Sequence, residues 1–211
     1  MKTLRALAAT VAAGLAASLG ACSATDRPAG EENILTYLEP QFFRTLYPPA
    51  AGFYPNGGVV NQLTDRLLYQ DPETLELSPW IATDMPEVNE DATEYTFDIR
   101  TDVTYSDGSP LTAENVVANF DLFGRGDKSR TLTSSEQIAN YDRGEVVDED
   151  TVKFYFTKPS PGFLQATSAY NAGLVSDSTL ELDNEGFGPG NAVNVIAVSY
   201  THLRAHETSL H

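Results

Sequence analysis

The side chains best suited to metal chemistry lie at the C-terminal end of the chain. His202, His206 and His211 are the only histidines in the sequence, and the first two stand four residues apart. This spacing places both on one face of a helix, as in helical zinc sites. A zinc protease carries a glutamate directly after the first histidine as its base, but Leu203 fills that position here. No third ligand follows in a structured context, so the pattern predicts no metal site.

The same C-terminal segment has a resemblance outside protein chemistry. All eleven residues from 198 to 208 fit the translation of a transposase sequencing adapter. We therefore interpret residues 197–211 as an adapter-derived appendage and leave them out of the functional reasoning. On this interpretation the native protein contains none of the three histidines.

Carboxylates are the other groups with the capacity for catalysis. Asp148, Glu149 and Asp150 are adjacent in a turn, where a solvated loop is the simplest interpretation. The chain has no Gly-x-Ser-x-Gly elbow and no phosphate-binding Walker loop. We predict that the protein is not an enzyme and needs no cofactor, with a lipid-anchored, carboxylate-dependent hydrolase as the alternative.

The N-terminal segment is typical of an export signal. Lys2 and Arg5 precede an apolar run over residues 6–19, which is shorter than the about 20 residues that span a bilayer. The run ends in Leu19-Gly20-Ala21-Cys22, which resembles the lipobox of bacterial lipoproteins and contains the only cysteine. We predict a signal peptide over residues 1–21, lipidation of Cys22 and a flexible tether over residues 22–33. The alternative is an ordinary cleavage site that leaves an unpaired thiol.

The charge of the chain limits its partners. The formal net charge is −17, and the few basic residues are scattered rather than clustered. This distribution excludes nucleic acid as an expected partner and favours a soluble, acidic surface.

The pattern of apolar residues predicts a mixture of helices and strands. Alternation predicts strands over residues 34–39 and 95–99, and a hairpin around Asp148–Asp150. Helical spacing predicts a helix over residues 59–69 and a second one that Thr112 caps and Gly124 ends. Between the first strand and the first helix lies an irregular segment, residues 40–58, that is rich in aromatic residues and proline.

One long motif gives these elements a family resemblance. The sequence YTFDIRTDVTYSDGSPLTAENVVANF, residues 95–120, closely resembles a stretch of the family 5 solute-binding lipoproteins of ABC importers. Flanking stretches over residues 63–82 and 146–164 match the same family in order and spacing. The motif consists of strand, turn and helix-cap residues, so we expect it to build the scaffold rather than to contact the ligand.

The resemblance implies the fold class and the division of the chain. The expected class is α/β (α+β), periplasmic-binding-protein-like type II, cluster C, with two lobes that close over the ligand. Only part of the large lobe is expected within residues 34–196. Residues 34–45 would begin that lobe, residues 46–169 would form an extra subdomain, and residues 170–196 would return toward the lobe.

The resemblance also implies a function and a set of partners. We expect a monomeric receptor that captures peptides and delivers them to the transmembrane subunits of an ABC permease. It would be held at the outer face of a bacterial cytoplasmic membrane, in the periplasm or at the cell surface, through Cys22. Alternative ligands within the family are nickel chelates, haem and oligosaccharides.

The residues expected to contact the ligand lie in and next to the aromatic segment: Glu39, Gln41, Tyr47, Tyr54 and Asn56. Tyrosine and asparagine supply adaptable hydrogen bonds, and Glu39 would meet the amino terminus of a peptide. The alternative for Tyr47 and Tyr54 is that their rings fill the core.

Overall fold

The computed structural model describes residues 38, 46–51, 54–125 and 138–181. Contacts between residues divide the chain into two compact units, residues 1–38 and 39–211. All the helices and strands described here belong to the second unit. The predicted signal peptide, tether, lipidation site Cys22 and C-terminal histidines lie outside the described residues, and so does the strand predicted at residues 34–39 apart from Leu38.

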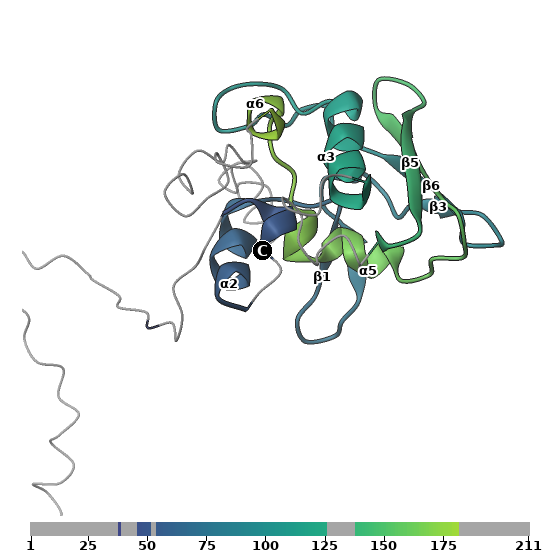
Figure 1. The fold of residues 1–211 in the computed structure, drawn as a ribbon, viewed down its shortest axis with the longest axis horizontal. Helices are drawn as coiled ribbons and strands as arrows, with labels where there is room; N and C mark the ends of the chain where they lie inside the picture. The colour runs from purple at the N-terminus through teal and green to yellow at the C-terminus, as the bar shows by residue number, and fades with distance from the viewer. Residues whose placement is uncertain (1–37, 39–45, 52–53, 126–137, 182–211) are drawn as a thin grey trace, which may run out of the picture. The chain divides into compact units, whose positions relative to one another are not determined.

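A four-stranded antiparallel sheet and a separate two-stranded hairpin organise this unit (Figure 1). The sheet has the order β3-β4-β6-β5, and β1 pairs with β2 in the hairpin. The strands are β1 Leu68–Gln70, β2 Leu77–Pro79, β3 Glu87–Val88, β4 Glu94–Asp98, β5 Tyr141–Val146 and β6 Thr151–Phe156. The helices are η2 Pro48–Ala50, α2 Tyr54–Leu63, α3 Ala113–Arg125, α5 Phe163–Ser168, η4 Tyr170–Ala172 and α6 Asp177–Leu180.

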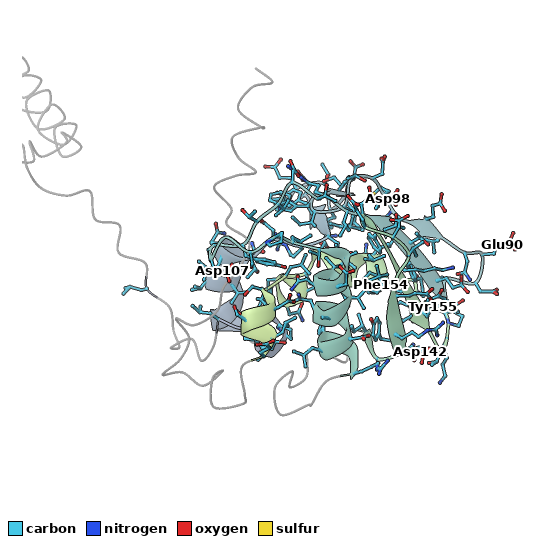
Figure 2. All side chains as sticks on the ribbon, turned by 90° about the horizontal axis from the view of Figure 1, so that it is seen from above. Glu90, Asp98, Asp107, Asp142, Phe154 and Tyr155 are labelled. Carbon is cyan, nitrogen blue, oxygen red and sulfur yellow. The ribbon has the colours of Figure 1, made fainter. Side chains whose placement is uncertain are left out.

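The predicted alternation along β4 and β6 is confirmed. Phe97 and Phe154 are completely buried on the face that α3 covers. Figure 2 shows Phe154 between α3 and the sheet, whereas its neighbour Tyr155 lies on the side of the sheet away from α3. On that opposite face the Arg143 guanidinium lies 3.9 Å from the centre of the Tyr155 ring. Side chains that alternate between faces thus give the sheet one apolar and one polar side.

Phe163, the first residue of α5, joins the sheet to the helices. Its ring centre lies 4.6 Å from that of Phe156, 4.9 Å from that of Tyr95 and 5.8 Å from that of Phe120. The rings meet in tilted or edge-to-face arrangements, which aromatic pairs prefer. This cluster fixes α5, and with it the following turn η4, against the sheet.

The predicted capping of α3 is confirmed, but the predicted role of Gly124 is wrong. The Thr112 hydroxyl oxygen accepts a hydrogen bond from the Asn115 N–H at 3.2 Å. The helix continues past Gly124 to Arg125. A Cβ atom on Gly124 would lie 2.7 Å from Cγ of Tyr141. The glycine therefore allows the helix to approach β5 closely rather than ending the helix.

The helix predicted over residues 59–69 is displaced in the structure. Helix α2 begins at Tyr54 and ends at Leu63, and Leu68 already belongs to β1. Proline at the second position of the helix, Pro55, favours this early start because the first turn needs no N–H donor from it. Leu67 has helical spacing in the sequence, but it lies after the end of α2. It is buried next to the hairpin and not on a helix.

A buried polar network connects α3 to the chain that follows η4. The amide of Asn119 accepts a hydrogen bond from the Val175 N–H at 3.0 Å and donates one to the Val175 carbonyl at 2.9 Å. Asn115 donates to the Asp177 carboxylate at 2.7 Å and accepts a hydrogen bond from the Tyr105 hydroxyl. Burial raises the pKa of Tyr105 well above its usual value, so this hydroxyl remains a donor.

Candidate functional site

The described residues form a hollow of about 550 Å³. It lies where α2, the β1–β2 hairpin and the α5–η4 junction meet. Its lining residues are Gly57, Gly58, Asn61, Gln62, Arg66, Tyr69, Gln70, Asp71, Pro72, Leu75, Ser168, Ala169 and Tyr170. A volume of several hundred cubic ångströms is typical of sites for small ligands.

Two of the lining residues carry a charge. Arg66 is only 7% exposed, and its Nη1 donates a hydrogen bond to Oδ1 of Asn61 on α2. Asp71 is half-buried at the start of the hairpin turn. Its Oδ1 accepts the backbone N–H groups of Glu73 and Thr74, both at 2.8 Å. These two bonds hold the pKa of Asp71 below its usual value, so the carboxylate is ionised at neutral pH.

Asp65 lies next to Arg66 in sequence but is not among the residues that line the hollow. It is only 1% exposed, and burial raises its pKa from 3.8 to about 6. A hydrogen bond with Trp80 and the charges of Arg66 and Arg100 oppose this rise only in part. Asp65 is therefore a buried acid beside the hollow, with a charge that changes near neutral pH.

Aromatic and apolar groups form the walls of the hollow. The Tyr69 ring stacks on the Trp80 ring with 5.1 Å between centres. The Tyr170 ring packs so closely on α2 that a Cβ atom on Gly57 would lie 2.9 Å from its Cε1. The glycine in α2 is thus required for this wall to form.

Leu75, at the rim, has an unusual backbone conformation. Its φ is 62°, in the left-handed region that favours glycine, and its side chain is 64% exposed. The Leu75 N–H donates to the Asp71 carbonyl, and the Leu75 carbonyl accepts from Gln70 Nε2 at 3.1 Å. The hairpin therefore holds an apolar side chain at the edge of the hollow at a conformational cost.

The described part of the chain contains only some of the predicted contact residues. Glu39 and Gln41 lie outside it, as do the side chains of Tyr54 and Asn56. The backbone of Tyr54 and Asn56 forms the first turn of α2, directly before Gly57 of the hollow. Their role in ligand binding stays a prediction.

Tyr47 is completely buried. It belongs to a small core cluster with Ala50 and Val175, against which Leu122 and Leu180 pack. In this structure the ring therefore fills the core, which was the alternative for this residue. A contact between Tyr47 and a solute is not tested by this packing and stays a prediction.

Asn171, in η4, is a buried polar residue that sequence reasoning missed. It is 1% exposed, and neither polar atom of its side-chain amide has a hydrogen-bond partner. It lines a cavity of about 10 Å³ with Pro49, Asn119 and Gly173 among others, which is room for about one water molecule. An asparagine in a three-residue turn carries no pattern that marks it in a sequence, so only tertiary packing reveals it.

Within the described ranges, no three His, Cys, Asp or Glu side chains gather in a way that would hold a metal ion. The acidic turn at residues 148–150 is exposed, as expected of a solvated loop. None of the helices in the described part is both long and apolar enough to cross a membrane.

Comparisons with known proteins agree with the resemblance. Residues 76–196 match the family described as bacterial extracellular solute-binding proteins, family 5 Middle. The chain is 31% identical over 147 residues to protein XP55 of Streptomyces lividans, an alignment that covers 67% of this chain and 26% of XP55.

Two solved structures show the same fold. NikZ from Campylobacter jejuni, in complex with Ni(L-His), aligns with a TM-score of 0.63 and 23% identity over 75% of this chain and 30% of NikZ. A dipeptide-binding protein from Pseudoalteromonas sp. SM9913, in complex with Met-Leu, aligns with a TM-score of 0.54 and 20% identity over 64% of this chain and 30% of that protein. The chain thus spans about 30% of the length of these proteins.

These matches confirm the predicted fold class, a periplasmic-binding-protein-like type II fold of which part is present. The matched family consists of solute-binding proteins, in agreement with the prediction of a protein that is not an enzyme. With more than half of its residues matched, the chain belongs to the bacterial extracellular solute-binding proteins of family 5.

Proposed function

We propose that the protein is the solute-binding component of an ABC importer and captures peptides outside the cytoplasmic membrane. The observation that supports this function is the hollow of about 550 Å³ in a chain of a solute-binding family. Helix α2, which carries Tyr54 and Asn56, lines it through Gly57, Gly58 and Asn61. The peptide would then pass to the transmembrane subunits of the permease.

The proposal includes a lipid anchor and the division of the chain that the resemblance implies. Cys22 would be acylated after removal of residues 1–21, and residues 22–33 would connect the lipid to a monomeric domain that begins near residue 34. Cys22→Ala should move the protein from the membrane fraction to the soluble fraction. A membrane-bound Cys22→Ala protein would argue against the anchor.

Calorimetry on the full-length protein tests peptide capture. A peptide at about 100 times its dissociation constant should raise the free energy of unfolding by about 2.7 kcal/mol and should be recovered unchanged. A hydrolase would consume the peptide instead. Peptides that neither bind nor stabilise would leave nickel chelates, haem and oligosaccharides as the solutes to examine.

Variants of the predicted contacts sharpen this test. Tyr54→Ala and Glu39→Gln should weaken peptide binding without changing the thermal unfolding of the free protein. Tyr155→Ala, on the polar face of the sheet, is the matched control and should bind normally. Unchanged affinity in the first two variants would reject these residues as contacts.

A further inference from the structure

Strand β5 ends the four-stranded sheet on one side in the described part of the chain. It pairs with β6, and its other side faces no described strand. Such an edge is a template for pairing with an extended segment of another protein molecule, and soluble proteins protect it. Helix α3 lies alongside β5 (Figure 1), and its side chains bond the backbone of this strand.

Three residues of α3 contact β5 at intervals of four: Val117, Asp121 and Arg125. Residues four apart lie on one face of a helix, so these three form a single row, which we call the edge cap. A Cβ atom on Gly144 of β5 would lie 2.8 Å from Cγ1 of Val117. Glycine at this position therefore lets the edge cap come close to the strand.

The two polar members of the edge cap bond the backbone of β5 directly. Oδ1 of Asp121 accepts the Gly144 N–H at 3.1 Å, so this N–H is used by the helix and not by β6. Nη1 of Arg125 donates to the Asp142 carbonyl at 3.0 Å. Asp142 has no partner residue in β6, because the register shifts between Tyr141 and Arg143. The two side chains thus supply the acceptor and the donor that a neighbouring strand would supply.

A second hydrogen bond fixes Asp121 over the strand. The Tyr141 hydroxyl donates to the same oxygen, Oδ1, at 2.9 Å. A carboxylate oxygen can accept both bonds. Because Tyr141 itself belongs to β5, the strand holds in place the carboxylate that covers it.

The opposite edge of the sheet has a different protection. Strand β3 contains only Glu87 and Val88, both exposed, and directly follows Pro86. A very short edge strand with a charge and a neighbouring proline offers little to pair with. Of the two edges, only β5, with six residues, is long enough to recruit another strand.

A second copy of this protein is the partner that fits the edge of β5. Two copies of one strand can pair antiparallel about a two-fold axis, so that the same surface meets itself. A pairing centred on Gly144 would bond the two Gly144 residues to each other and place Arg143 of each copy opposite Glu145 of the other. Opposite charges across a strand pair are favourable, so the sequence of β5 supports this pairing.

We propose that Val117, Asp121 and Arg125 act as an edge cap that keeps β5 from pairing with β5 of a second copy. The Gly144 N–H is the group that such a pairing needs at its centre, and Asp121 already occupies it. Val117 lies against Gly144 at the same point. The inference concerns assembly and holds whatever solute the protein binds.

Sedimentation equilibrium of the full-length protein tests the edge cap. The double variant Asp121→Ala, Arg125→Ala should form dimers at concentrations at least roughly tenfold below any at which the wild type does. Asp121→Asn is the matched control, because its oxygen can still accept the Gly144 N–H, and it should behave as the wild type. Tyr141→Phe loses only the hydroxyl bond to Asp121 and should also stay monomeric. A double variant that associates no more than the wild type would overturn the proposal, as would dimers of Asp121→Asn.

Hydrogen exchange locates the contact between the copies. In the dilute double variant the Gly144 N–H should exchange faster than in the wild type, and in the dimer it should become protected again. Adding Arg143→Glu should abolish the dimer, because two acidic side chains would then face each other. A dimer that leaves the Gly144 N–H unprotected would place the contact elsewhere and overturn the inference. If circular dichroism shows that the double variant does not fold, Asp121→Ala alone is subject to the same measurements.

Discussion

At the scale of single residues, burial determines the pKa of Asp65. Its carboxyl group lies beside Trp80, Arg66 and Arg100, yet its pKa of about 6 remains above the usual 3.8. Removal from water therefore outweighs the hydrogen bond and the two positive charges. The neutral form of the carboxyl is the one that the fold prefers.

This preference predicts a dependence of stability on pH. Because the pKa of the folded state lies above that of the unfolded state, the stabilisation is complete below pH 3.8 and is lost as the pH rises through about 6. Asp65→Asn cannot titrate, so its stability relative to wild type should increase by about 2 kcal/mol between about pH 4 and about pH 7.

Urea unfolding of both proteins across that pH range measures the difference. Asp84→Asn, at an exposed position, is the control and should follow the wild-type profile. If the profiles of Asp65→Asn and wild type ran parallel, the carboxyl of Asp65 would not be the group responsible.

At the scale of elements, the contact between α3 and β5 depends on a glycine. Tyr141 packs over Gly124, and its hydroxyl donates a hydrogen bond to Asp121 at 2.9 Å. Alanine at position 124 would favour the helix by up to about 1 kcal/mol but would press into the tyrosine ring. The ring is fixed by its hydroxyl, so it cannot move away without losing that bond.

Gly124→Ala should therefore lower the free energy of unfolding by about 1 to 3 kcal/mol. Gly162→Ala is the matched control, because its φ is −76° and a Cβ atom there would meet nothing within 4 Å. That variant should be neutral or more stable by up to about 1 kcal/mol. Equal effects in chemical denaturation would show that close packing does not explain Gly124.

At the scale of the whole described unit, Asn119 joins segments that are distant in sequence. Its amide bonds both polar groups of the Val175 backbone, 56 residues away. Asn119→Leu would leave the Val175 N–H without this partner, whereas the Val175 carbonyl would keep the hydrogen bond that it accepts from Asn115 Nδ2 at 3.2 Å. The expected loss of stability is about 1 to 3 kcal/mol, the cost of one buried group left without its partner.

Asn140→Ala is the control, because its side chain makes a single, longer bond of 3.4 Å to Ser160. It should cost less than about 1 kcal/mol. Hydrogen exchange should also show the Val175 amide less protected in Asn119→Leu and unchanged in Asn140→Ala. An amide that stays fully protected without Asn119 would contradict this role.

The sequence by itself determined the elements whose residues follow one clear period. The alternation of β4 and β6, the Thr112 cap and the hairpin around residues 148–150 were predicted because each depends on neighbours within a few residues. The family also followed from these local motifs, since the long strand–turn–helix motif lies in one continuous stretch.

Only the tertiary structure decided the features that depend on distant partners. The structural role of Gly124 depends on its contact with Tyr141. The end of α2 depends on the pairing of β1 with β2, and the burial of Tyr47 depends on Val175. The hollow likewise brings together residues 57–75 and 168–170. Arg66 and Asn171 carry no local pattern, because burial and the partners that surround a side chain are properties of the folded chain alone.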